Sequence, residues 1–218
     1  MKTRFVLLSL SVLLFSSCIV KSIQPFYTQD TISFEKRLIG DWKTGTTTTW
    51  KIISFKEEWE KENDPNTNLT KEDKQNFERY KNSYYVEYTK DETKASFIAM
   101  PFKLGDYFFL DFTPFEYDSG DLNRLAAQHL LKTHSAAFVE FNTEGFDLKW
   151  IPEGTIGRLI REKKLRIKHE KTGIDDDLIL TATTKELQSF LKKFITSEID
   201  NKWDNDDIYK LRKIDAAP

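Results

Sequence analysis

Alternation of apolar and polar residues is the sequence feature that most constrains how this chain folds. Over residues 146–150, Phe146, Leu148 and Trp150 alternate with Asp147 and Lys149. Successive side chains of a strand point to opposite faces, so this pattern predicts a strand with one face in the core. Strand-like runs recur from residue 38 to residue 214 and number about ten, which indicates a β-rich domain.

Three or four helices are expected beside these strands. Thr183 and Glu186 form a capping-box pattern, and the apolar residues behind it recur at helical spacing. Residues 57–82 form a charged stretch that we expect to be a helical insertion. Most predicted strands follow one another directly or across one helix, whereas a doubly wound sheet needs a helix after nearly every strand. The sequence therefore predicts a mainly β (α+β) fold, an antiparallel barrel or half-barrel with three to four flanking helices.

Several local elements can be placed more closely. Gly105 separates two strand patterns and suits a tight hairpin. Residues 118–128 have helical spacing, and residues 130–141 are expected to form a long strand. Residues 165–169 and 177–182 are expected to form another strand pair.

Gly40-Asp41-Trp42 opens the β-rich region and resembles the G-x-W signature on the first strand of lipocalin-type barrels. The resemblance implies that the Trp42 indole closes the barrel base beneath a basic residue of the last strand, Arg212 or Lys213. Such a cation–π contact contributes about 1 kcal/mol or more when it is desolvated. The alternative is an ordinary core tryptophan on an edge strand.

A broader resemblance extends over roughly residues 84–195. The blocks Phe97–Phe112, Gln128–Leu131 and Leu178–Leu191 are similar to blocks found in the same order in a family of uncharacterised bacterial proteins. The resemblance implies one continuous domain, here residues 34–218, and it implies no catalytic residue. Relative to that family, residues 57–82 look inserted.

The N-terminus has the pattern of a secretory signal. A basic start precedes an apolar run from Phe5 to Phe15, which is shorter than the roughly 20 residues of a bilayer span. Phe15-Ser16-Ser17-Cys18 resembles a bacterial lipobox, which implies that residues 1–17 are a lipoprotein signal peptide and that the Cys18 thiol carries lipid. The alternatives are an ordinary cleaved signal and an uncleaved anchor. Residues 18–33 are then expected to form a tether.

This resemblance implies a place in the cell. Ile19, rather than Asp, follows the cysteine, so we expect sorting to the outer membrane of a Gram-negative-type bacterium, with membrane attachment through the N-terminal lipid. The chain carries 33 basic and 35 acidic residues, a formal charge of −2, which argues against a nucleic-acid partner. No protein partner can be named from the sequence.

Candidate sites for chemistry are few. His129 and His134 lie five residues apart, which brings them together on neither a strand nor a helix, so we expect no metal site. Asp111 and Glu140 lie among apolar strand residues, where burial would make either a candidate acid. The sequence contains no nucleophile, phosphate or dinucleotide motif, and we expect neither a cofactor nor catalysis.

Aromatic residues concentrate between residues 97 and 146. They either fill a small barrel or line a pocket for an apolar small molecule, and the candidate lining residues are Phe97, Phe109, Phe138 and Trp150. We therefore expect a non-catalytic binding module for an apolar ligand or an envelope partner. The alternatives are a structural lipoprotein with a solid barrel core and a hydrolase that uses a carboxylate such as Asp111.

Overall fold

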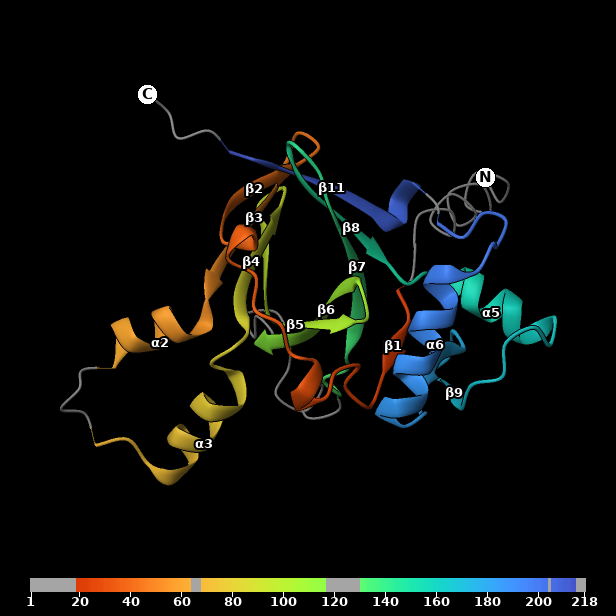
Figure 1. Cartoon of the computed structure of the whole chain (residues 1–218), viewed down its shortest axis with the longest axis horizontal. Coiled ribbons are helices and arrows are strands. Elements are labelled where there is room, and N and C mark those ends of the chain that lie inside the picture. The colour runs from red at the N-terminus through yellow and green to blue at the C-terminus, as the bar shows by residue number, and fades with distance from the viewer. Residues whose placement is uncertain (1–18, 64–67, 117–129, 204, 215–218) are drawn as a thin grey trace, which may run out of the picture.

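The computed structural model describes residues 19–63, 68–116, 130–203 and 205–214. Within them, eight antiparallel strands close into a barrel in the order β11-β2-β3-β4-β5-β6-β7-β8, and β8 pairs with β11 (Figure 1). The strands are β2 (Gly40–Thr44), β3 (Thr48–Ser54), β4 (Tyr84–Lys90), β5 (Thr93–Leu104), β6 (Tyr107–Glu116), β7 (Ser135–Phe141), β8 (Gly145–Trp150) and β11 (Ile208–Lys213). The predicted lipocalin-like, mainly β fold is confirmed, and the barrel is closed rather than half open.

A second, three-stranded sheet lies outside the barrel. It contains β1 (Lys21–Ser22), β10 (Asp177–Leu180) and β9 (His169–Thr172), with β1 parallel and β9 antiparallel to β10. The predicted pairing of residues 165–169 with 177–182 was therefore misplaced by a few residues. Leu165 and Ile167 alternate with charged residues as a strand would, but the ladder forms only from His169 onward.

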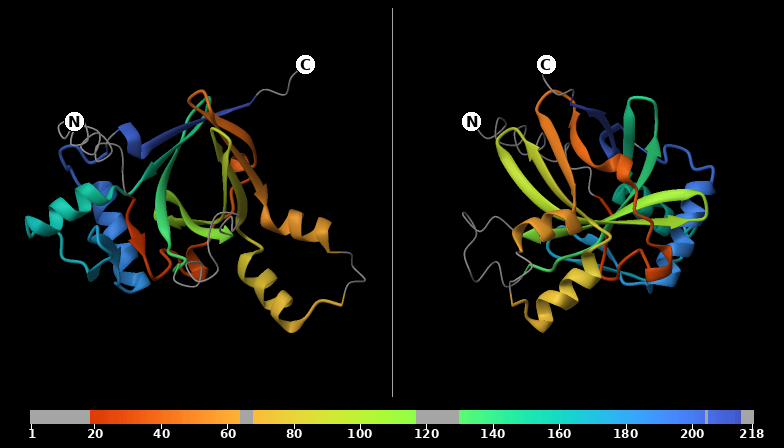
Figure 2. Two further views of the ribbon diagram at one scale, coloured as in Figure 1. Left: turned by 180° about the vertical axis from the view of Figure 1, so that it is seen from behind. Right: turned by 60° about the vertical axis from the view of Figure 1, so that its left-hand side comes forward.

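Four α-helices flank the barrel within the described residues. They are α2 (Phe55–Glu62), α3 (Lys71–Tyr80), α5 (Glu153–Arg161) and α6 (Thr184–Thr196), together with the short 3-10 turns η1 (Gln29–Thr31), η2 (Lys36–Leu38) and η3 (Asn205–Asp207). The α2–α3 hairpin extends from one side of the barrel, and α5 and α6 lie on the opposite side (Figures 1 and 2). None of the described helices has both the length and the apolar content that crossing a bilayer requires.

The predicted helix starts and turns are largely confirmed. The side chains of Thr183 and Glu186 bond each other's backbone N–H groups at the start of α6, and the stretch 57–82 contains the two helices of the hairpin. Gly105 adopts φ +68° in a two-residue hairpin between β5 and β6. The strand expected over 130–141 begins only at Ser135, and the helix expected over 118–128 lies outside the described residues.

Residues 19–33 are part of the folded domain, so the prediction of a tether over 18–33 is wrong for the described part of that range. Val20 and Phe26 are fully buried, and β1 pairs with β10. Gln24-Pro25 prevents a helix, but it leaves the segment free to lie extended against the barrel. Cys18 and the expected signal peptide lie outside the described residues.

Two apolar cores share the barrel wall. Side chains that point into the barrel form one core, and side chains on its outer face form the other with β1, α5 and α6. Strand β6 serves both, since Phe108, Leu110 and Phe112 point inward and Phe109 points outward. Period-two alternation thus places neighbouring residues in different cores.

Candidate ligand pocket

A pocket of about 340 Å³ opens at one end of the barrel. It is lined by Ile19, Lys21, Trp50, Tyr88, Phe97, Phe112, Pro114, Thr133, Ser135, Trp150 and Tyr209. Seven barrel strands contribute to this wall, at the ends where β6 and β8 finish and β7 and β11 begin. The volume lies at the lower end of the range typical for small-molecule sites.

The four residues predicted to line a ligand pocket fall into two pairs in the structure. Phe97 and Trp150 line the pocket, whereas Phe109 and Phe138 face outward and pack in the core beneath α6. The two misplaced residues are direct cross-strand partners and their rings lie 5.5 Å apart. Because both strands are hydrophobic on both faces, composition alone did not show which face lines the barrel.

Aromatic rings build most of the pocket wall. The ring centroids of Trp50 and Tyr88 lie 4.8 Å apart, those of Trp50 and Tyr209 5.8 Å apart, and those of Phe112 and Trp150 4.8 Å apart. Edge-to-face packing of this kind holds large side chains in fixed positions. The wall is therefore a rigid, mainly apolar surface.

One polar group in this wall lacks a partner. Trp50 is 3% exposed, and its indole N–H finds no hydrogen-bond acceptor among the described residues. A buried donor without an acceptor costs roughly 1–3 kcal/mol, so buried indole N–H groups normally have one. The side chain of Trp50 thus brings an unsatisfied donor into a mainly apolar wall. Trp50 was not among the residues predicted from the sequence, where its only signal was its place in the Thr- and Ile-rich strand pattern.

Two tyrosines add neutral polar groups to the same wall. Burial is the main cause that raises the pKa of Tyr88 and of Tyr209, and the neighbouring Tyr209 phenol raises that of Tyr88 further. Both hydroxyls therefore keep their protons at neutral pH. They offer hydrogen bonds to a ligand without adding charge.

The N-terminal segment contributes to the pocket. Ile19 and Lys21 line it, and the Lys21 ammonium lies 3.1 Å from an Asp177 carboxylate oxygen. A backbone bridge joins Ile19 to Pro152, at the start of α5. Ile19 and Lys21, two of the first three residues after the expected lipidation site, therefore border the pocket, and Val20 between them is buried.

The predicted Gly40-Trp42 motif lies on β2, where Trp42 pairs directly with the pocket residue Trp50 of β3. Trp42 is buried, its indole N–H donates to the Leu38 carbonyl at 2.9 Å, and its ring packs edge-on against Phe146 at 4.8 Å. Of the two basic residues expected over the indole, Arg212 or Lys213, it is not Arg212 that lies there. The Lys213 ammonium lies 6.0 Å from the Trp42 ring centroid instead.

Arg212 takes a different role because successive residues of β11 face opposite sides of the sheet. Its guanidinium lies 3.0 Å from a carboxylate oxygen of Glu144 and 3.0 Å from one of Asp147. It therefore ties the last strand to the β7–β8 hairpin on the outside of the barrel.

The two carboxylates singled out on strands have different environments. Asp111 is buried, accepts a hydrogen bond from the Phe26 backbone N–H at 2.8 Å, and lies 2.9 Å from Nδ1 of His134. Burial raises the pKa of Asp111, and the bond to His134 opposes that shift. Glu140 is half exposed and pairs with Lys149.

Neither carboxylate lines the pocket. Asp111 lies on the outer face of β6, where it holds the N-terminal segment against the barrel. Within the described residues, no cluster of three or more histidine, cysteine or acidic side chains has the geometry of a metal site. His129 lies outside those residues, and His169 bonds the Ile167 carbonyl through Nδ1.

No family model, curated protein or solved structure matches this chain.

Proposed function

We propose that this chain is a lipid-anchored bacterial envelope protein whose barrel binds an apolar small molecule that carries a hydrogen-bond acceptor. The observation that carries the ligand proposal is the unpartnered Trp50 N–H in an aromatic pocket of about 340 Å³. A fatty acid, or a lipid with one ester carbonyl, has this chemistry. No catalytic role is proposed, because the strand carboxylate Asp111 lies outside the pocket and is used in packing.

The anchoring part of the proposal rests on the N-terminal sequence. Phe15-Ser16-Ser17-Cys18 has small residues before a thiol that accepts a diacylglyceryl group, and lipid chains on one cysteine meet the two-signal requirement for stable attachment. Attachment at Cys18 would place the pocket residues Ile19 and Lys21 next to the bilayer surface. A ligand drawn from the membrane would then have a short route into the barrel.

Lipidation is tested by labelling cells with radioactive palmitate. The wild-type protein is expected to incorporate label, and the Cys18→Ser variant is expected to lose all of it. Lys21→Ser serves as the control, since it alters the same segment without removing the thiol. Equal labelling of the wild type and Cys18→Ser would refute the anchor.

Ligand binding is tested by native mass spectrometry of the full chain purified from its host, followed by calorimetric titration with oleate. Replacing Trp50 with benzothienylalanine, which keeps the ring shape and removes the N–H, is expected to weaken oleate binding about three- to tenfold. The same replacement at Trp59 on α2 is the control and leaves affinity unchanged.

The second candidate is a structural lipoprotein without a ligand. Its supporting observation is that most of the barrel interior is filled by buried side chains, among them Leu110, Val139 and Leu148. This candidate predicts that no small molecule co-purifies and that oleate produces no binding heat. The two functions are therefore separated by the same titration.

A further inference from the structure

A strongly basic groove lies on the outer side of the α5–α6 layer, away from the barrel pocket. It has a volume of about 950 Å³ and is lined by Lys163, Lys164, Leu165, Arg166, Ile167, Lys168, Lys185, Glu186, Ser189, Phe190 and Lys193. Six of these residues are cationic and one is acidic. The whole chain carries a formal charge of −2, so this concentration of positive charge is local.

Two rows of side chains form the groove. In the segment that precedes β9, Leu165 and Ile167 are partly buried against the core, while Lys164, Arg166 and Lys168 are exposed between them. In α6, Lys185, Ser189 and Lys193 are spaced four residues apart and lie on successive turns of one exposed face. Each row thus directs its polar side chains outward and its apolar side chains toward the core.

The single acidic residue of the groove offsets one of its six positive charges. The Glu186 carboxylate accepts hydrogen bonds from the Thr183 backbone N–H and hydroxyl, each at 2.8 Å, as part of the α6 cap. One of the cations, Lys164, pairs with Glu162, which is outside the groove lining. The charge is therefore available to an external anion.

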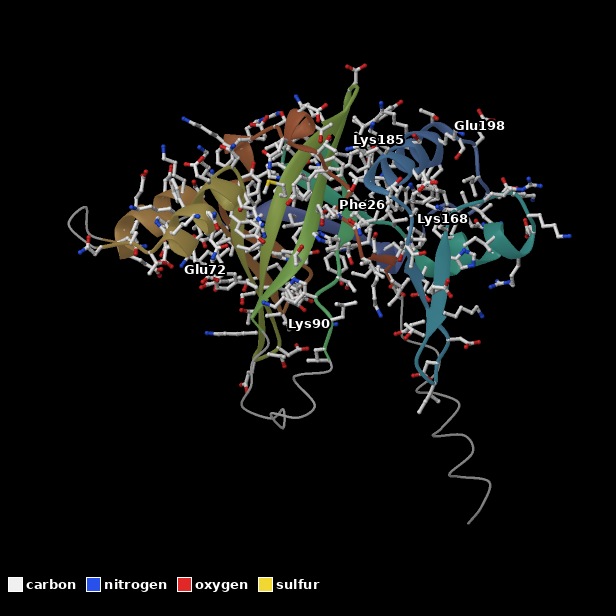
Figure 3. All side chains as sticks on the ribbon, turned by 90° about the horizontal axis from the view of Figure 1, so that it is seen from below. Phe26, Glu72, Lys90, Lys168, Lys185 and Glu198 are labelled. Atoms are coloured by element: carbon white, nitrogen blue, oxygen red, sulfur yellow. The ribbon has the colours of Figure 1, made fainter. Side chains whose placement is uncertain are left out.

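The groove lies on the same side of the barrel as the start of the described chain. The described chain begins at Ile19, which bridges to Pro152 at the start of α5, and continues into β1 beside β10. These elements and α6 lie on one side of the barrel, while the α2–α3 hairpin lies on the other (Figures 1 and 2). Lys168 and Lys185 both lie on this side, remote from Glu72 of α3 (Figure 3).

We propose that this groove binds the phosphate headgroups of an anionic lipid bilayer and holds the α5–α6 side of the protein against the membrane. The proposal rests on the proposed attachment at Cys18, which would keep such headgroups at high local concentration around the groove. Each lysine or arginine near an anionic membrane contributes about 1 kcal/mol, and a basic patch is a known second signal for membrane attachment.

A lipid surface fits the groove better than a nucleic acid does. Binding of single-stranded nucleic acid relies on exposed aromatic rings for base stacking, but Phe190, the aromatic residue in the groove lining, is 6% exposed.

The test compares lysine acetylation of the full chain in vesicles of phosphatidylcholine and in vesicles with equal parts of phosphatidylcholine and phosphatidylglycerol. Mass spectrometry measures the acetylation rate of each lysine. Lys164, Lys168, Lys185 and Lys193 are expected to react several-fold more slowly in the anionic vesicles, and high salt is expected to remove the difference. Lys71 and Lys74 on the far hairpin serve as internal references and keep the same rate in both.

A charge variant supports the same test. In the Cys18→Ser chain, which lacks the proposed lipid, replacing Lys164, Lys168 and Lys185 with Gln is expected to weaken flotation with anionic vesicles about fivefold per lysine, and in the lipidated chain the same replacement is expected to abolish the protection of Lys193. The matched variant replaces the exposed Lys56, Lys71 and Lys74 with Gln, which changes net charge equally, and keeps both properties.

Three results would overturn the groove proposal. They are equal acetylation in the two kinds of vesicle, equal effects of the two triple variants, and protection by soluble glycerophosphate at the same phosphate concentration as the lipid. Failure of the anchor is detected separately by palmitate labelling. If the protein carries no lipid, the groove proposal still predicts that it floats with anionic vesicles and that this flotation depends on the groove lysines.

Discussion

Gly145 shows how one backbone position controls closure of the barrel. This glycine begins β8 and pairs with Arg212 of β11, where a Cβ atom would lie 2.2 Å from the Leu211 carbonyl oxygen and 3.1 Å from the Trp42 ring. Real Cβ atoms do not approach a carbonyl this closely, so any side chain forces β8 and β11 apart. The strand pair that completes the barrel therefore requires glycine at this point.

Gly145→Ala is expected to lower the free energy of unfolding by about 2–4 kcal/mol, because the Cβ clash disrupts both the β8–β11 pairing and the packing of Trp42. Urea denaturation followed by tryptophan fluorescence measures the change. Gly154→Ala in α5 is the control, since its Cβ would meet no atom within 4 Å. Equal stability of the two variants would contradict the argument.

Ionisation of Tyr27 makes the free energy of unfolding depend on pH in the alkaline range. Burial, and then the charge of Asp111, raise the pKa of Tyr27 from 10.0 to about 12. The unfolded chain loses this proton near pH 10 while the folded chain keeps it, so the stabilisation is complete below pH 10 and disappears as pH rises toward 12.

The Tyr27→Phe variant cannot ionise at this position, so it is expected to lose less stability than the wild type between pH 10 and 12. Denaturant midpoints measured across that range test this expectation. Tyr85→Phe, at a half-buried tyrosine whose ring packs edge-on against Phe115, provides the comparison and should follow the wild type. Parallel curves for all three proteins would show that Tyr27 ionises equally in both states.

The N-terminal segment behaves as an integral element. Phe26 is completely buried between the barrel and α6, its backbone N–H bonds Asp111, and the backbones of Ser22 and His134 bond each other at 2.8 and 2.9 Å (Figure 3). These contacts join segments more than 80 residues apart. Asp111 is therefore the polar connection between the barrel wall and the segment that leads from Cys18.

Asp111→Ala is expected to lower the free energy of unfolding by about 2–4 kcal/mol, since it leaves the Phe26 N–H and His134 without their buried acceptor. Hydrogen exchange should increase first in residues 19–28. Glu140→Ala is the matched control, because that carboxylate is half exposed and its ion pair contributes at most about 1 kcal/mol. Unchanged exchange in residues 19–28 of Asp111→Ala would contradict the connection.

The whole molecule separates three surfaces around one barrel. The proposed ligand pocket lies at one end, a second pocket is lined by Trp42, Phe146 and Lys213, and the basic groove lies on the side formed by α5 and α6. The α2–α3 hairpin, held by stacking of Trp59 on Phe77 and of Phe55 on Trp59, extends from the opposite side. In the proposed orientation the groove and Ile19 face the bilayer while the hairpin points away from it.

Local patterns were sufficient to predict the elements. The alternation at Phe146, Leu148 and Trp150, the Thr183–Glu186 cap and the Gly105 hairpin depend on residues within a few positions of each other, and all are present in the structure. The barrel followed from the number and order of such elements. Candidate pocket residues were less predictable, because β6 and β7 are apolar on both faces.

Contacts between distant parts of the chain determined the features that local sequence patterns did not predict. Closure of β8 on β11, the choice of Lys213 rather than Arg212 over the Trp42 ring, and burial of Val20 and Phe26 depend on which distant strands meet and in which register. The unpartnered Trp50 N–H follows from the same cause, since the strands that meet around it place no protein acceptor within hydrogen-bond reach. Neighbouring residues specify backbone conformation through short-range sterics and hydrogen bonds, whereas burial and pairing are properties of the assembled chain.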